Sequence, residues 1–377
     1  MRITCILGPF LPVPPLRGGA VERIWQNLCM EFARCGHQVT LVSRQFPSLP
    51  TKEYINGVCY IRVPSFDAPR SKLLYRMYDL VYAYRASEVL PSSDVTITNS
   101  VSLPLILPRR KAGHIYVNVN RFPKGQMWLY RRVDRLQAVS SPVAEAIARQ
   151  TPSMASKVKV IPNALSETFS RHRRNERGTR SREVLYVGRI AREKGIELVI
   201  RGFRSVVGHD DWHLTLLGPS DASAGGDGPD YLASLQTLAG SSRSRIRFEA
   251  ALYDEERLIE RMRAAEIFVY PSIAERGESF GMAPLEAMSC GCAVIVSELP
   301  CFRAFATHEE SAMIFDHRDR EGNSLAKTLQ KLMDSEPVRD AIAKTALQAS
   351  TKFDCSRVAR LYLEDFAELA NARPRTV

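Results

Sequence analysis

The segment that decides the fold is residues 278–297, which read ESFGMAPLEAMSCGCAVIVS. It opens with the carboxylate of Glu278 and a short Ser-Phe-Gly loop, and Pro284 suits the first turn of a helix. Glu286 then lies inside that helix, and an apolar strand follows at 293–296. Because a helix N-terminus attracts anions, the segment predicts a phosphate site with one carboxylate on either side. The alternative is two solvated glutamates that flank an ordinary helix start.

The same alternation of strand and helix extends along the chain in two series. Apolar runs predict strands in the first series at 3–7, 39–42, 58–63, 95–98, 115–119 and 136–139, and in the second at 184–187, 214–217, 246–248, 267–270, 293–296 and 312–315. Helical spacing of apolar residues follows the first strand of each series, over Val21–Phe32 and Ile196–Phe203. Strands that alternate with helices predict parallel sheets covered on both faces, which is an α/β fold.

The alternation weakens at 161–164 and breaks in the basic run that follows. A chain of 377 residues suits two domains. We therefore expect a first domain at 1–168, a basic linker at 169–182 and a second domain at 183–355, with a C-terminal helix at 356–377 that packs back on the first domain. Two doubly wound sheets facing across a cleft would bind ligands at the carboxyl ends of their strands.

The composition is that of an ordinary globular protein with an excess of positive charge. The chain has 52 basic and 41 acidic residues, which gives a net charge of +11. This balance favours an anionic partner: a phosphorylated substrate, an anionic membrane surface or nucleic acid. Nucleic acid is disfavoured, because no nucleic-acid module is recognisable and aromatic residues are not interleaved with the basic runs.

The sequence predicts a cytoplasmic protein. No apolar run approaches the roughly 20 residues that a spanning helix needs, and prolines interrupt the short apolar stretch at the N-terminus, which reads better as a buried strand than as a signal peptide. The segment 72–90 is rich in Tyr and Leu and carries Lys72, Arg76 and Arg85. Such a helix can contact the inner face of the plasma membrane, although core packing is the commoner role of an apolar stripe.

A second motif, Gly188-Arg189 with Lys194-Gly195, directly follows the first strand of the second series. An arginine binds phosphate through a bidentate fork and a lysine adds a compact charge, so the pair can balance a diphosphate. The sequence contains no Asp-x-Asp and no CxxC, and its one close cysteine pair, Cys290 and Cys292, has no histidine at metal-ligand spacing. We therefore expect no metal and no cofactor. The alternative for this motif is a solvated loop.

Taken together, the motifs resemble the family 4 retaining glycosyltransferases of the GT-B fold. The resemblance covers nearly the whole chain and rests, in order, on Gly18-Gly19, residues 161–164, Gly188-Arg189, Lys194-Gly195 and the Glu278-to-Glu286 segment. It implies a transferase that moves a sugar from a nucleotide-diphosphate sugar, with a UDP-sugar favoured, to a glycan or lipid-linked acceptor.

The resemblance also implies roles for individual residues. Gly18 and Gly19 would let the backbone approach the donor phosphate, and Arg189 and Lys194, next to Gly188, would stabilise the charge of the leaving diphosphate.

On the sugar side, Glu278 would hold hydroxyls of the transferred sugar, together with the Phe280 and Gly281 amides. Glu286 would bind the ribose of the nucleotide.

The departure from the family pattern that bears on the chemistry is a missing histidine. The family has a histidine after the strand at 115–119, whereas this sequence has Asn118 or Asn120 there. Asparagine forms hydrogen bonds but does not exchange a proton at neutral pH, so Asn118 is expected to replace the histidine only in binding. Arg121 and Lys124, just beyond, are candidates for contact with an acceptor phosphate, or form a basic surface loop.

Two other functions stay open at this point. A non-catalytic protein that binds a sugar nucleotide would explain the missing histidine. A nucleotide-sugar epimerase on the same fold would need acid and base carboxylates in both domains, and the first half of the sequence offers no clear pair.

Overall fold

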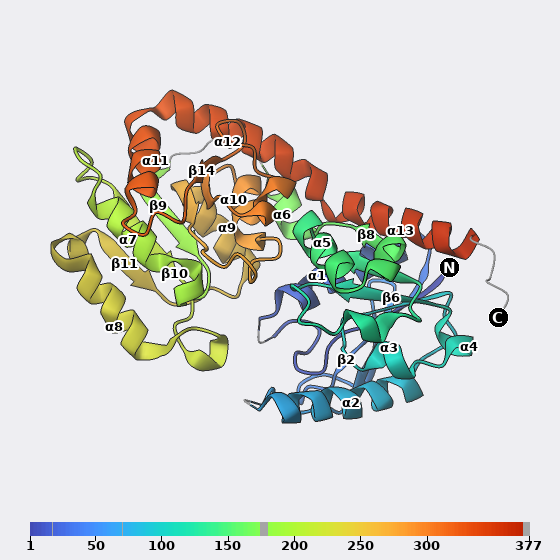
Figure 1. Ribbon diagram of the computed structural model, residues 1–377. Helices are drawn as coiled ribbons and strands as arrows, with labels where there is room; N and C mark the ends of the chain where they lie inside the picture. The colour runs from blue at the N-terminus through green and yellow to red at the C-terminus, as the bar shows by residue number, and fades with distance from the viewer. Residues whose placement is uncertain (17, 70, 174–179, 372–377) are drawn as a thin grey trace. The chain divides into compact units, whose positions relative to one another are not determined.

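The computed structural model describes residues 1–16, 18–69, 71–173 and 180–371, which form two compact units (Figure 1). One unit consists of Met1–Ser166 with Phe353–Val377, and the other of Glu167–Lys352. The expected linker at 169–182 overlaps helix α6 (Glu167–Arg171) and the start of strand β9 (Ser181–Val187). Its residues 174–179, and residues 372–377 of the expected C-terminal helix, lie outside the described residues.

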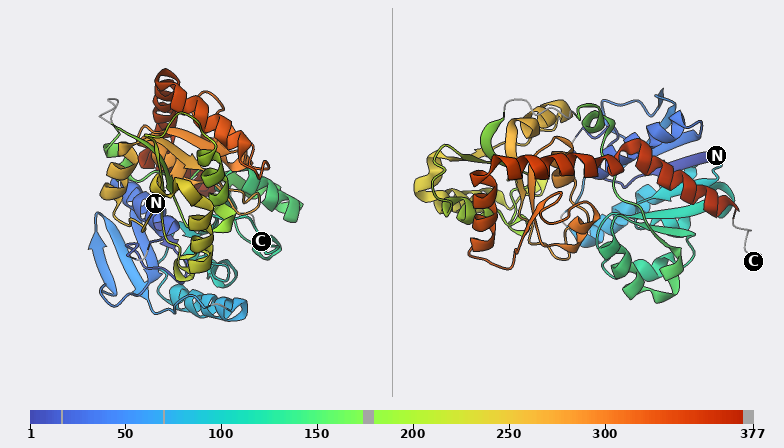
Figure 2. Two further views of the ribbon diagram at one scale, coloured as in Figure 1. Left: turned by 90° about the vertical axis from the view of Figure 1, so that its left-hand side faces the viewer. Right: turned by 90° about the horizontal axis from the view of Figure 1, so that it is seen from above.

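In the described part of the first unit, eight strands form one sheet in the order β3-β4-β2-β1-β5-β6-β7-β8. All neighbours pair in parallel except β3, which runs antiparallel to β4 at one margin of the sheet (blue in the left view of Figure 2). The strands are β1 (Arg2–Ile6), β2 (Gln38–Arg44), β3 (Lys52–Ile55), β4 (Val58–Val63), β5 (Val95–Thr98), β6 (His114–Val119), β7 (Arg135–Ala138) and β8 (Val158–Val160).

The first unit's helices are α1 (Ala20–Arg34), α2 (Lys72–Glu88), α3 (Leu103–Ile106), α4 (Arg109–Ala112), α5 (Ser141–Gln150) and α13 (Cys355–Asn371). Helix α13 comes from the end of the chain and packs against α1. Its Tyr362 ring lies 5.2 Å from Trp25, and Asp365 forms an ion pair of 2.7 Å with Arg135 on β7. These contacts make α13 part of the first unit's core.

The second unit contains a parallel sheet with the order β11-β10-β9-β12-β13-β14 within the described residues. Its strands are β9, β10 (His213–Leu217), β11 (Ile246–Glu249), β12 (Ala265–Tyr270), β13 (Ala293–Ser297) and β14 (Met313–Phe315). Its remaining helices are α7 (Ile196–Arg204), α8 (Gly228–Ala239), α9 (Glu255–Ala264), α10 (Met282–Ser289), α11 (Asn323–Asp334) and α12 (Glu336–Ser350). The strand order reverses between β9 and β12, so ligand binding is expected at the carboxyl ends of these two strands.

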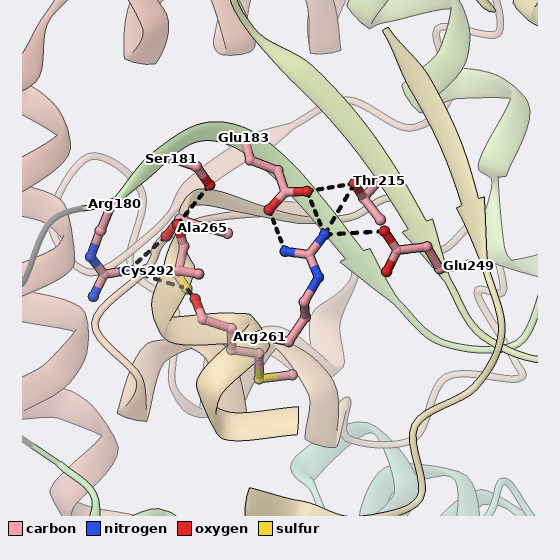
Figure 3. A network of polar contacts seen from close by, with 10 residues as sticks. Arg180, Ser181, Glu183, Thr215, Glu249, Arg261, Ala265 and Cys292 are labelled. Atoms are coloured by element: carbon pink, nitrogen blue, oxygen red, sulfur yellow. Dashed lines mark hydrogen bonds and ion pairs between the residues drawn. The ribbon is translucent and has the colours of Figure 1, made fainter. Parts of the chain in front are cut away.

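A partly buried polar network connects α9 to three strands of the second unit's sheet (Figure 3). The Arg261 guanidinium binds both carboxylate oxygens of Glu183 on β9, and it also donates to Thr215 Oγ1 over 3.2 Å and lies 3.5 Å from Glu249 Oε1. Glu183 and Thr215 are buried, so the charges are paired inside the protein, as buried charges must be. The network joins β9, β10 and β11 to one helix.

The described arginines of the basic run at 169–182 also form contacts within the second unit. Arg180 donates to the backbone oxygens of Ala265 and Cys290, over 2.6 Å and 2.9 Å, and Arg182 pairs with Asp211. These arginines therefore stabilise the second unit's sheet at the amino ends of its strands.

The predicted α/β architecture of two doubly wound sheets is confirmed, and the predicted strands are present with shifts of a few residues at their ends. Two short strands, β3 and β8, were not predicted. Both lie at sheet margins. β3 is largely open to solvent and lacks an apolar pattern, and β8 is only three residues long, too short for a reliable pattern.

Candidate active site

Three side chains meet at the carboxyl ends of β9 and β12. Lys194 follows β9 in a short 3₁₀ turn (Arg192–Lys194), Tyr270 is the last residue of β12, and Glu278 lies in the loop before α10. Lys194 Nζ is 2.6 Å from Glu278 Oε2 and donates to Tyr270 Oη over 2.9 Å. Lys194 and Glu278 are each only 8% exposed. The sheet's reversal point therefore carries a buried ion pair with a tyrosine hydroxyl on it.

Aromatic rings enclose this cluster. The Tyr270 ring stacks on Tyr186 at 5.9 Å, meets Phe302 edge-on at 6.0 Å, and lies 5.2 Å from Lys194 Nζ. Burial raises the pKa of the Tyr270 hydroxyl well above its usual range, and the charge of Glu278 adds to the effect. Tyr270 therefore keeps its proton and stays available to accept a hydrogen bond from Lys194. Sequence reasoning missed this residue, although its place at a strand end beside the Glu278 loop was a usable signal.

Gly195 allows the close approach that brings Lys194 into the cluster. Its φ is +65°, and a Cβ at this position would lie 2.1 Å from the backbone oxygen of Pro271. Only glycine fits both the left-handed backbone and the contact. This explains in physical terms why glycine follows Lys194.

Arg189 lies between the end of β9 and this 3₁₀ turn, directly after Gly188. Its guanidinium donates to Glu193 Oε1 over 2.6 Å and to the backbone oxygen of Gly225 over 2.7 Å. The charge of Arg189 also acts on the Tyr270 hydroxyl, where it lowers the pKa against the effect of burial. Arg189 is thus a half-exposed cation beside the buried pair.

The remaining residues that are expected to bind the sugar donor lie in or next to helix α10. Gly281 is its N-cap, with φ +86°, and a Cβ there would lie 2.5 Å from the Phe302 ring. Phe280 is buried against Phe305, with ring centroids 5.6 Å apart. Glu286 is buried in the second turn of the helix. The helix start and both carboxylates therefore lie in one unit, at one end of one sheet.

The predicted first-unit residues occupy the loops after β1 and β6. Gly18 and Gly19 precede α1 with φ of +75° and +119°, and a Cβ on Gly19 would lie 2.4 Å from Glu22 Oε2. Burial raises the pKa of Glu22, and the nearby charge of Arg121 opposes the rise. Arg121 and Lys124 are exposed beyond β6. Glu22 is a buried carboxyl that the sequence analysis did not single out.

Asn118 belongs to a chain of buried amides inside the first unit. Its Oδ1 accepts from Trp25 Nε1 over 3.1 Å, and its Nδ2 donates to Gln137 Oε1. Gln137 continues the chain to the backbone oxygen of Ile161. Asn118 is 4% exposed, so this placement gives it a structural part in the core. Asn120, just beyond β6 and partly exposed, is the better candidate for the histidine's place.

Across residues 1–16, 18–69, 71–173 and 180–371, no three or more His, Cys, Asp or Glu side chains are grouped as a metal site would require. None of the helices in these ranges is long and apolar enough to cross a membrane.

Comparisons with known families give matches along most of the chain. Residues 17–168 match the model "Glycosyltransferase Family 4", and residues 167–349 match "Glycosyl transferases group 1". Spore coat protein SA of Bacillus subtilis (strain 168) is 23% identical over 95% of this chain and 97% of its own length. A phosphatidyl-myo-inositol mannosyltransferase of Mycobacterium tuberculosis (strain ATCC 25618 / H37Rv) is 26% identical over 59% of this chain and 57% of its own length.

Solved structures show the same fold. Sucrose-phosphate synthase from Thermosynechococcus elongatus superposes with a TM-score of 0.76 and 21% identity, over 98% of this chain and 100% of that one. Anabaena HepE in complex with UDP and glucose gives a TM-score of 0.72 and 15% identity, also over 98% and 100%.

The fold and the matches define a glycosyltransferase of the GT-B fold. The chain belongs to the family 4 glycosyltransferases, and it is an enzyme.

Proposed function

We propose that this enzyme transfers a sugar from a nucleotide-diphosphate sugar, preferably a UDP-sugar, to a glycan or lipid-linked acceptor. The transfer retains the configuration of the sugar and uses no metal ion. The observation that carries the proposal is the cluster of Lys194, Tyr270 and Glu278 at the sheet's reversal point, with Arg189 beside it.

The cluster suits a diphosphate leaving group. A lysine ammonium has three donors, and Glu278 and Tyr270 engage two of them. The third can turn to a phosphate oxygen, and the Arg189 fork adds a second cation. Negative charge grows on the diphosphate as the glycosidic bond breaks, and fixed cations in a water-poor site stabilise that charge. Two cations in this position can do the work that a divalent ion does elsewhere.

Glu278 binds the transferred sugar in the same arrangement. Its Oε2 is held by Lys194, which leaves Oε1 for hydroxyl groups of the transferred sugar. The Phe280 and Gly281 amides at the start of α10 reinforce this contact, and Glu286 receives the ribose hydroxyls. The ion pair with Lys194 keeps Glu278 fixed before the donor arrives.

The acceptor side belongs to the first unit. Gly18 and Gly19 leave room for the donor phosphate, Asn120 contacts the reacting sugar, and Arg121 and Lys124 meet an acceptor phosphate.

The names of related proteins support the proposed classes of donor and acceptor. One group is named serotype-specific mannosyltransferase WbdA and another phosphatidyl-myo-inositol mannosyltransferase, which favours cell-surface polysaccharide or glycolipid assembly. Structural neighbours were solved with UDP, UDP-glucose and glucose-6-phosphate. We further propose that this enzyme works in the cytoplasm, in peripheral contact with the inner face of the plasma membrane.

The direct test is release of nucleotide diphosphate from a panel of UDP- and GDP-sugars, each with and without EDTA. We expect one donor to be turned over, at the same rate in EDTA, and Glu278→Gln to abolish turnover while the protein stays folded. A rate that collapses in EDTA would overturn the metal-free mechanism. Full activity of Glu278→Gln would overturn the assignment of the carboxylate.

A further inference from the structure

The loop that joins β10 to α8, residues 218–227, is fixed near both ends to the segment that follows β9 (Figure 1). Near one end, the Ile190 amide donates to the backbone oxygen of Pro219 over 2.9 Å. At the other end, the Asp227 amide donates to the backbone oxygen of Ile190 over 3.1 Å, and Asp227 Oδ2 accepts from the Arg192 amide over 2.6 Å. The backbone of this segment therefore holds the two ends of the loop.

Between these ends, residues 221–226 form a strap that is held by an arginine side chain. Arg189 Nη1 donates to the backbone oxygen of Gly225 over 2.7 Å. The φ of Gly225 is +83°, and a Cβ there would lie 2.9 Å from Arg189 Cδ, so a larger residue would push the arginine away. Residues 221–224 are exposed. Within the described part of the chain, no side chain other than Arg189 donates a hydrogen bond to the strap.

The guanidinium of Arg189 also binds a carboxylate. Its Nη2 donates to Glu193 Oε1 over 2.6 Å, and the two side chains are 43% and 48% exposed. An arginine grips phosphate through two parallel N–H groups, and every such pair includes Nη1 or Nη2. A diphosphate therefore competes with Glu193 and with the Gly225 carbonyl for Arg189.

Charge decides this competition in favour of the diphosphate. An ion pair as exposed as that of Arg189 with Glu193 is weak, because solvent screens it. The hydrogen bond to the Gly225 carbonyl is weaker than one to a phosphate oxygen, because the carbonyl carries no full charge. The diphosphate also repels the Glu193 carboxylate. Once Arg189 turns to the diphosphate, the strap loses its side-chain contact while the ends of the loop keep their backbone contacts.

We propose that Arg189 holds the strap until a nucleotide diphosphate takes its guanidinium, and that the strap then opens. Glu193 lowers the affinity for the diphosphate, because the diphosphate has to displace it. Return of Arg189 to Glu193 and Gly225 helps the nucleotide to leave after transfer. The inference rests on the proposed function, since the diphosphate is the ligand that releases the strap.

Amide hydrogen exchange on the full chain, resolved to single residues, tests the opening of the strap. The Ala224 and Gly226 amides donate to the backbone oxygen of Asp221 inside the strap, over 3.0 Å and 2.9 Å. UDP should speed their exchange on the order of tenfold, since the strap loses a hydrogen bond to a charged group. The Ile190 and Asp227 amides hold the ends of the loop, so their exchange should not rise.

Arg189→Met tests the same contact without a ligand. Exchange at Ala224 and Gly226 should be as fast in this variant as in the UDP complex, and UDP should not speed it further. The matched control is Arg182→Met, which removes an arginine of the same unit from an exposed ion pair with Asp211. The control should leave exchange in the strap unchanged, and thermal melts check that both variants fold.

Glu193→Gln tests the competition for Arg189. Removal of the carboxylate charge should strengthen UDP binding, measured by calorimetry, up to about fivefold, which is the most that an exposed ion pair contributes. The matched control is Glu145→Gln, which removes a carboxylate from Arg149 on α5, an exposed pair with the same four-residue spacing. The control should bind UDP like the unaltered protein.

The strap is refuted if UDP binds while exchange at Ala224 and Gly226 stays the same or slows, or if Arg189→Met leaves that exchange unchanged. Equal or weaker UDP binding by Glu193→Gln would refute the competition. If neither UDP nor GDP binds the unaltered protein, the proposed function fails, and release by a diphosphate fails with it. Faster exchange in Arg189→Met would then show that the contact with the strap is correct and that the error lies in the ligand.

Discussion

Lys194 Nζ lies 2.6 Å from Glu278 Oε2, although 84 residues separate the two along the chain. Both side chains are buried, so neither charge is tolerated without the other. The pair therefore has two consequences that must be separated by experiment: it holds two loops together, and it forms the centre of the proposed donor site.

Single and double substitutions separate these consequences. Lys194→Met or Glu278→Gln should each lower the free energy of unfolding by about 3 kcal/mol, since each leaves one buried charge without its counter-charge. The double variant Lys194→Met/Glu278→Leu should recover much of that loss, because both charges are gone. Sugar transfer should be absent in all three. Urea unfolding, followed through the transitions of both units, gives the stabilities.

The control for this series is Arg182→Met/Asp211→Leu, which removes an exposed ion pair from the same unit. It should leave stability close to that of the unaltered protein and leave transfer intact, because solvent screens an exposed pair. A double variant at 194 and 278 that is as unstable as the worse single variant would contradict the pairing.

Tyr270→Phe removes only the hydroxyl that accepts a hydrogen bond from Lys194. The ring stays stacked on Tyr186, so stability should fall by only about 1 kcal/mol for the lost hydrogen bond. Transfer should fall about tenfold, because a Lys194 that is held less firmly stabilises the leaving group less well. Tyr82→Phe is the matched control, as that buried hydroxyl has no hydrogen-bond partner. An unchanged kcat in Tyr270→Phe would remove Tyr270 from the mechanism.

Gly195→Ala should disable the site through the backbone. The added methyl group would lie 2.1 Å from the oxygen of Pro271, in the segment that leads to Glu278. Gly208→Ala has a comparable φ of +77° with nothing within 4 Å, so it shows the cost of the left-handed backbone alone, about 1 kcal/mol. The Gly195 variant should lose at least twice as much, measured by urea unfolding, together with nucleotide binding. Equal losses in the two variants would show that close approach does not matter.

Glu22 predicts a pH-dependent stability. Burial raises its pKa in the folded state, so the ionised carboxylate opposes folding, and stability from this group is lost as pH rises through the folded pKa. Glu22→Gln should therefore be more stable than the unaltered protein at neutral pH. The difference should vanish once the pH falls below the ordinary glutamate pKa, about 4.3. Thermal melts from acid to neutral pH test this, and a constant difference across that range would refute it.

Local patterns were enough to predict the two sheets and to select the candidate residues for donor binding. The apolar residues of a buried parallel strand identify it in the sequence. The motif at 188–195 directly follows one such strand, and the motif at 278–286 begins in the loop that follows another. The pairing of Lys194 with Glu278 and Tyr270 could not be read from the sequence, because it depends on β9 and β12 being neighbours in the sheet. Asn118 shows the same limit, since its partners Trp25 and Gln137 come from other elements.

The central claim is that a nucleotide diphosphate binds at Arg189 and Lys194 without a metal ion. Thermal unfolding in the presence of UDP, GDP, ADP or CDP, each with and without EDTA, tests it most directly. One diphosphate at 100 times its dissociation constant should stabilise the folded protein by about 2.7 kcal/mol, equally in EDTA, and far less in Arg189→Ala. If none of the four diphosphates shifts either unfolding transition, Arg189 and Lys194 do not form a nucleotide site and the account is contradicted.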